Sequence, residues 1–422
     1  MQTDQGATRC PQCAHQLPAD PLYVTWCDRC DWNVDPTGPT DKTPAWRLRL
    51  EHRLAETLYR ELEQGKIHRP GWDAARVAAY LLSAVILLLP LAGLLGGIAL
   101  LVFYRPLWLS ASLSIIPFGL AFLLRPRANQ LDSDTRLIHR EQAPLLFALL
   151  DKIAVAVGTT PVGAVAVDAE PNIYYARVGW RFTPVVGIGL SLWMGLRPQE
   201  RVAVLAHELG HGRNGDARHG WVVNSAAAIL DELDETFSEQ PLDQYRQELI
   251  YATGTDTTPS LITRIVNATV GGAVSGVQWM LTMIDLRSRQ RAEYLADRRS
   301  AEIAGSEACA RALERSVLVD TPWRALQHAV RFSSELDPLE EAGRAVNEIP
   351  AREVERRLRV SGLRDSRIDS SHPPTNLRVK LIRARPTQSA LVVLGNDQSR
   401  AIDRELAGPA EGVLKELRSA LR

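Results

Sequence analysis

The sequence predicts an α+β protein that is mainly helical, with a small sheet, preceded by a cysteine-rich module and a hydrophobic helical hairpin. Three observations support this fold class. Two long apolar runs lie between residues 77 and 124, where Arg105 is the only charged residue. Helical spacing of apolar residues marks the segment 141–157 and the one that begins at Pro198. Between these helices, three short apolar segments have strand character, at residues 162–167, 172–178 and 184–190.

The composition is that of a globular protein large enough for two or three domains. The 422 residues are 45% hydrophobic, and 49 basic side chains balance 49 acidic ones. This neutral net charge favours neither nucleic acid nor an acidic substrate as a partner. The first seven residues contain no apolar run, so we expect no cleavable signal peptide and a reducing compartment for the early cysteines.

The two apolar runs are each long enough to span a membrane. Val77–Tyr104 has 28 residues without a charge and Pro106–Leu124 has 19, and about 18 residues suffice for a spanning helix. A hairpin buried in a soluble domain is the alternative, but neither run has the polar face that such a helix shows. Basic residues flank the pair of runs, whereas the turn has Arg105 alone. The positive-inside rule therefore predicts an integral protein of the plasma or inner membrane, with both termini and the domain that follows the second run in the cytoplasm.

Four of the five cysteines form two C-x-x-C pairs separated by 13 residues. This spacing is typical of a structural zinc ribbon with four thiolate ligands, here Cys10, Cys13, Cys27 and Cys30. Two labile disulfides are the alternative, which a reducing compartment disfavours. The first 40 residues contain two arginines and five aspartates, a net charge of −3 that argues against nucleic-acid binding. We expect a ribbon that is purely structural or that docks a protein partner.

His207, Glu208 and His211 form an H-E-x-x-H motif inside the helix predicted from Pro198. Residues four apart share one helix face, so both imidazoles can bind one zinc ion. Glu208 lies about 100° further round the helix, where it can face a water molecule instead of the metal. Two capping or core histidines are the alternative, which the apolar residues before the motif disfavour because buried imidazoles need polar partners.

A catalytic zinc site of this kind needs a third protein ligand, and Glu293 is the candidate. Asp297 lies one helical turn later, where it can accept the second ring N–H of a ligating histidine. An exposed acidic face paired with the neighbouring arginines is the alternative, and it is less favoured beside an H-E-x-x-H motif.

Three motifs occur in this order: H-E-L-G-H-x-x-x-x-D from His207 to Asp216, E-Y-x-A-D from Glu293 to Asp297, and H-P-x-x-x-x-R from His372 to Arg378. Together they resemble the membrane zinc metallopeptidases of the HtpX and CAAX prenyl protease type, over residues 131–384. The resemblance implies a gluzincin fold, with a small sheet beside the metal-binding helix and a peptide substrate along an edge strand. It also implies that Asn172 begins this strand, that His372 lies near the zinc and stabilises the oxyanion, and that Arg378 and Asp216 support the ligands.

The predicted activity is therefore that of a membrane-anchored zinc endopeptidase with Glu208 as general base. Its partners would be the lipid bilayer and a polypeptide substrate at or in the membrane, with no nucleic acid. A non-catalytic adaptor that recruits a partner through the ribbon is the main alternative, and a hydrolase of non-peptide amides is another. The predicted organisation is a ribbon (1–44), an amphipathic linker helix (45–75), two transmembrane helices (76–125), the peptidase domain (130–384) and a C-terminal strand and helix (385–422).

Overall fold

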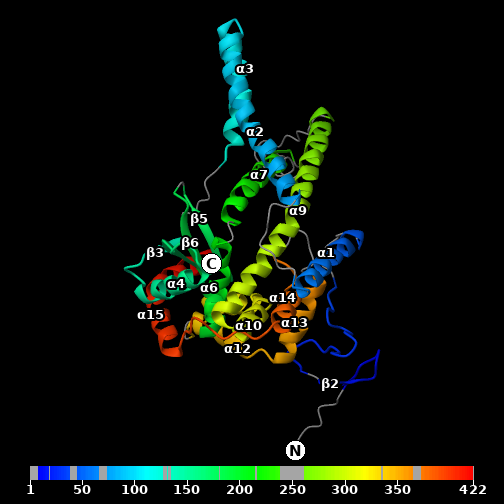
Figure 1. Ribbon diagram of the computed structural model, residues 1–422, viewed down its shortest axis with the longest axis vertical. Coiled ribbons are helices and arrows are strands. Elements are labelled where there is room, and N and C mark those ends of the chain that lie inside the picture. The colour runs from blue at the N-terminus through cyan, green and yellow to red at the C-terminus, as the bar shows by residue number, and fades with distance from the viewer. Residues whose placement is uncertain are drawn as a thin grey trace, which may run out of the picture. The chain divides into compact units, whose positions relative to one another are not determined.

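A computed structural model gives the fold of the chain (Figure 1), and the mainly helical α+β class predicted from the sequence is confirmed. It describes residues 8–18, 20–38, 45–65, 74–126, 131, 135–179, 181–213, 216–237, 261–333, 336–364 and 372–421. The predicted boundary regions at residues 39–44 and 66–73 lie outside these ranges. The chain forms two compact units, the first with residues 1–69, 129–215 and 289–422, and the second with residues 70–128 and 216–288.

A small mixed sheet lies in the first unit, with its four strands in the order β3-β4-β6-β5. Strand β4 pairs antiparallel with β3 and parallel with β6, and β6 pairs antiparallel with β5. Strand β5 is therefore an edge strand. The strands are β3 (Arg136–Ile138), β4 (Ala164–Asp168), β5 (Ile173–Val178) and β6 (Thr183–Gly189).

The core of this unit forms between the sheet and the helices α4 (Pro144–Val157) and α6 (Pro198–Arg213). Helix α4 buries apolar side chains such as Phe147 and Leu150 completely, and the short helix α5 (Leu190–Gly195) adds the fully buried Trp193. Because α6 is buried along most of its length, its position relative to the sheet is fixed by packing. The other helices of this unit are α10 (Ser306–Ser316), α11 (Asp320–Phe332), α12 (Pro338–Asn347), α13 (Ala351–Arg364), α14 (Thr375–Ala384) and α15 (Asn396–Ala420).

Helix α1 (Ala45–Glu63), predicted as a linker, packs on the helices of the first unit. Leu58, Tyr59 and Leu62 are buried in one cluster with Tyr294 and Leu381. The amphipathic pattern of the helix therefore has a defined packing partner. The ribbon that precedes it carries a two-stranded sheet of β1 (Thr8–Arg9) and β2 (Gln16–Leu17).

The C-terminal segment packs on the same unit. The strand predicted within residues 385–422 does not form: residues 385–395 are irregular, because the backbone N–H groups of Leu391 and Val392 donate to the single carbonyl of Ile303 and not to a neighbouring strand. Helix α15 follows, and hydrogen bonds from Arg201 and Trp193 to its Asp403 hold it in place.

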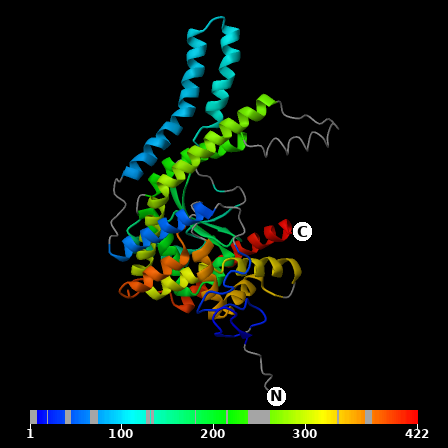
Figure 2. The ribbon, with the colours of Figure 1, turned by 90° about the vertical axis from the view of Figure 1, so that its right-hand side faces the viewer.

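The second unit contains α2 (Ala74–Phe103), α3 (Leu107–Leu123), α7 (Asp216–Phe237) and residues 261–288 of the long helix α9 (Leu261–Ala304). Helices α2 and α3 lie side by side (Figure 2) and pack closely at small residues. A Cβ on Gly97 would be 2.6 Å from the Phe118 ring, and one on Gly93 would be 2.8 Å from the carbonyl oxygen of Pro117. Glycine at such positions lets apolar helices approach each other closely.

Residues 216–288 belong to this second unit, so the predicted peptidase domain (130–384) has residues in both units. Val274 and Leu281 of α9 join Val223 and Ile229 of α7 and Ile86 of α2 in one apolar cluster. Among the described helices, α2 is long and apolar enough to cross a membrane, and α3, with 17 residues, is shorter. Most of their large apolar side chains are exposed, among them Leu81, Val85, Phe103, Ile115 and Phe122.

Asp403 of α15 should be a main anchor of the C-terminal helix. Its Oδ1 accepts hydrogen bonds from the buried Arg201 at 2.7 Å and from Trp193 Nε1 at 2.9 Å. Because Asp403→Ala removes the carboxylate that pairs with the buried Arg201 guanidinium, we expect a loss of about 2–4 kcal/mol in the free energy of unfolding. Asp397→Ala, at a carboxylate that is 97% exposed, is the matched control, and we expect a change below about 0.5 kcal/mol. Equal denaturation curves for the two variants would contradict the assignment.

Candidate active site

Helix α6 positions the three residues of the H-E-x-x-H motif. The helix begins at Pro198, and the Glu200 carboxylate accepts the Arg197 N–H at 2.8 Å, as in a capping box. His207 is buried, whereas Glu208 and His211 are partly exposed. The buried apolar face of the helix thus fixes the direction in which these side chains point.

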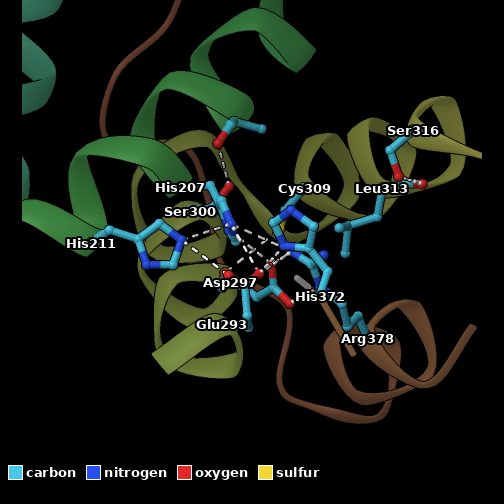
Figure 3. Close-up of polar contacts among 11 residues, drawn as sticks. His207, His211, Glu293, Asp297, Ser300, Cys309, Leu313, Ser316, His372 and Arg378 are labelled. Carbon is cyan, nitrogen blue, oxygen red and sulfur yellow. Dashed lines mark hydrogen bonds and ion pairs between the residues drawn. The ribbon is translucent and has the colours of Figure 1, made fainter. Parts of the chain in front are cut away.

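Three donor atoms come together as predicted from the motifs. His207 Nε2 and His211 Nε2 are 3.3 Å apart, and each lies 3.4 Å from an oxygen of Glu293 on α9 (Figure 3). A tetrahedral zinc ion bound at about 2.0–2.1 Å separates its ligand atoms by about 3.3–3.4 Å. The triangle of two imidazoles and one carboxylate therefore fits a zinc ion in both size and donor type.

Asp297 contacts His207, one of the three residues of this triangle. Its Oδ1 lies 3.0 Å from His207 Nδ1, so it can fix the tautomer in which Nε2 faces the metal. The carboxylate also accepts two hydrogen bonds from Arg378 of α14, at 2.8 and 2.7 Å. Burial raises the pKa of Asp297, but Arg378 and His207 outweigh burial and lower it to about 2. Asp297 therefore stays ionised at any physiological pH.

The electrostatics of the cluster favour a cation at the histidines. Burial disfavours the charged form of His207, but the hydrogen bonds to Asp297 and Glu293 outweigh burial and raise its pKa to about 10. Burial also opposes ionisation of Glu293, yet His207 and His372 hold its pKa well below the usual value. The buried carboxylates thus stabilise positive charge where the metal would bind.

His372 and Arg378 reach the same cluster. His372 Nδ1 lies 2.6 Å from Glu293 Oε2, and the imidazole is half-exposed. Arg378 is 6% exposed, and its Nη2 lies 3.5 Å from Glu293 Oε2. The late motif therefore lies beside the predicted ligands, as the resemblance implied. The side chain of Asp216 lies outside the described residues.

A cavity of about 540 Å³ opens beside His207 and Glu208. Asn172 lines it just before the edge strand β5, and the backbone carbonyl of Asn172 accepts the N–H of Gly189 at 2.7 Å. Much of the wall is apolar, and its residues include Leu192, Leu196, Ala312, Leu313 and Val319. The cavity can therefore take an apolar group next to the predicted water-activating carboxylate.

Two residues of the site have no signal in the motifs. The hydroxyl of Ser300 donates to the backbone carbonyl of Ala203 at 2.7 Å and joins α9 to α6. Cys309 is buried and also lines the cavity. Burial, followed by the nearby Asp297 charge, raises the pKa of its thiol to about 12, so the thiol stays neutral.

The four ribbon cysteines also come together. Cys10 and Cys30, and likewise Cys13 and Cys27, have sulfur atoms 3.5 Å apart, and all four sulfur atoms lie within 4.8 Å of one another. A tetrahedral zinc ion bound at about 2.3 Å separates its sulfur ligands by about 3.8 Å. The cluster therefore fits a closed four-thiolate site.

Asp297→Asn should weaken zinc binding at the histidine site about 10- to 100-fold, because it removes the charge that orients His207 while it keeps the size of the side chain. Titration of zinc against a competing chelator measures this change. Glu302→Gln is the matched control, since Glu302 lies on the same helix and pairs with Arg298 and Arg299 away from the site. An unchanged zinc affinity in Asp297→Asn would mean that Asp297 only binds Arg378.

Comparison with known proteins agrees with this geometry. The model of peptidase family M48 matches residues 146–386, more than half of the chain, and the match contains the H-E-x-x-H helix, Glu293, Asp297, His372 and Arg378. No curated protein and no solved structure matches the chain at a significant level. The resemblance seen in the sequence is confirmed: the chain belongs to peptidase family M48 and is a zinc metallopeptidase.

Proposed function

We propose that this metallopeptidase is a membrane-anchored endopeptidase in which Glu208 is the general base. The observation that carries the proposal is the position of Glu208. It lines the cavity next to His207 but lies outside the triangle of His207, His211 and Glu293. A purely structural metal site has no need of a carboxylate in this place, so the position disfavours a non-catalytic adaptor.

The side chains of the site have separate roles in this mechanism. His207, His211 and Glu293 would hold the zinc ion, which as a Lewis acid lowers the pKa of water and polarises a carbonyl group. Glu208 takes a proton from the attacking water and delivers it to the leaving amine. His372 lines the cavity beside Glu293, where its imidazole can donate a hydrogen bond to the oxygen that becomes negative.

The edge strand β5 is the proposed template for the substrate backbone. It pairs with β6 on one side, and its first residue, Ile173, forms part of the cavity wall together with the preceding Asn172. An extended polypeptide can add to such an edge as a further strand, with its backbone N–H and C=O groups paired. This arrangement favours a polypeptide over a small amide as the substrate.

The hairpin of α2 and α3 is the proposed membrane anchor. Its apolar side chains point outward along both helices, whereas in a soluble protein they would be covered. Basic residues on both flanks favour a cytoplasmic position for the two termini and the peptidase domain, with the turn at Arg105 on the opposite side. The substrate would then be a membrane protein or a protein close to the membrane.

Glu208→Gln should keep the fold and both zinc ions but lower turnover by roughly 10²- to 10⁴-fold, the usual effect of losing a general base. Metal analysis and cleavage of a casein-type substrate measure the two properties on the same sample. Glu307→Gln, at a carboxylate that is 63% exposed, is the matched control and should retain full turnover. Wild-type activity in Glu208→Gln would refute this mechanism.

The proposed topology can be tested by the labelling of two introduced cysteines. Phe103, which is 85% exposed, lies next to the turn of the hairpin, and Arg418 is exposed on α15. In intact cells, a membrane-impermeant maleimide should label Phe103→Cys, whereas Arg418→Cys should be labelled only after the membrane is permeabilised. The parent chain is the control for its own five cysteines. Labelling of both positions from one side would exclude the hairpin as a membrane anchor.

A further inference from the structure

The zinc ribbon is docked on the peptidase unit by the arginines of α13. The indole of Trp26 contacts the guanidinium groups of Arg352 and Arg359, each 4.8 Å from the ring centre. Arg359 also binds Asp31 at 2.6 Å, and Arg364 binds Asp35. The acidic ribbon therefore has a basic partner within the same chain, and its position on α13 is specific.

A second cavity of about 640 Å³ lies where the ribbon meets α10, α11 and α13. The ribbon contributes Val24, Asp35, Pro36 and Thr37 to its wall. The segment that provides these residues, 20–38, lies outside the stretch matched by the family model. This cavity is therefore a feature that the added ribbon creates on the peptidase.

The two cavities adjoin each other. Ser316, at the end of α10, and Thr375, at the start of α14, line both of them. Ser316 is exposed, and its hydroxyl is turned to the backbone carbonyl of Leu313. A polypeptide that occupies the active-site cavity can therefore continue past Ser316 into the cavity at the ribbon.

The chemistry of the two cavities differs. The active-site cavity has the apolar wall described above, whereas four guanidinium groups line the ribbon cavity, from Arg324, Arg356, Arg357 and Arg364. Three carboxylates oppose them: Asp35 binds Arg364, Glu353 is shared by Arg356 and Arg357, and Asp320 also lines the wall. Arg324 is exposed and makes no ion pair among the described residues. The ribbon cavity thus has an excess of positive charge, with Arg324 accessible.

We propose that the ribbon cavity is a distal substrate subsite that takes an acidic side chain of the polypeptide whose apolar side chain occupies the active-site cavity. The inference rests on the proposed peptidase function and adds a substrate class to it. Arg324 provides the accessible charge, and the ribbon forms the outer wall. The substrate would be a chain with an apolar residue at the scissile bond and an Asp or Glu several residues away.

The test uses pairs of synthetic peptides of about twelve residues, which extend roughly 40 Å. Each has a central Leu–Leu bond and one Glu, moved along the peptide from pair to pair, and its twin has Gln at the same position. Cleavage by the full-length chain gives kcat/KM, and binding of labelled peptides to the Glu208→Gln chain gives Kd without turnover. We expect one position, separated from the scissile bond, at which Glu is favoured over Gln by about two- to fivefold in both measurements, with the preference falling as salt rises.

Arg324→Gln should remove this preference, and Arg324→Lys should retain most of it. Arg331→Gln is the matched control, because Arg331 lies on the same helix but not at the cavity, and it should leave the preference unchanged. Equal binding of Glu and Gln peptides at every position, or an equal effect of the two Gln variants, would overturn the subsite. Peptides that bind with the Glu preference but are cleaved equally by the wild type and Glu208→Gln would leave the subsite in place and refute the proposed mechanism.

Discussion

The site depends on the contacts that the buried carboxylate of Asp297 makes. It is 1% exposed, accepts two hydrogen bonds from Arg378 and lies within hydrogen-bond distance of His207. A buried carboxylate destabilises a fold by several kcal/mol unless it is fully paired. The helices that supply its partners, α6 and α14, must therefore converge on α9. The same convergence brings Glu293, one helical turn before Asp297, to the two histidines.

This arrangement explains why the cluster is suited to a metal ion. Glu293 and Asp297 are both buried and ionised, whereas Arg378 supplies a single permanent positive charge. One further positive charge is needed close to His207 for the cluster to be neutral. A proton on His207 can provide it, which is the reason its pKa is raised, and a divalent ion bound by both histidines would bring positive charge to the same place. Proton and metal therefore compete for the same place.

From the sequence, the residues of this cluster could be predicted more completely than the packing of the elements around it. The i, i+4 spacing fixes His207 and His211 on one helix face, and the motif order identified Glu293 and Arg378 despite their separation along the chain. The docking of Trp26 on α13 had no such signal, because its arginines are complementary to a segment more than 300 residues away. An amphipathic pattern likewise shows that α1 has a buried face but does not show which residues cover it. Nor does such a pattern show that α9, one continuous helix, changes packing partners along its length.

The catalytic contacts of the core and the charge attraction at the ribbon differ in how much displacement of the side chains they tolerate. The ligands and Glu208 act over hydrogen-bond distances, so displacements of about 1 Å are sufficient to disturb them. They lie on helices whose buried faces pack in one way. A charge that attracts an acidic side chain across a solvated cavity acts over several ångströms and needs no such precision. The cavity wall formed by the ribbon and α13 can therefore vary between related peptidases without disturbing the chemistry, and substrate choice can change independently of the catalytic core.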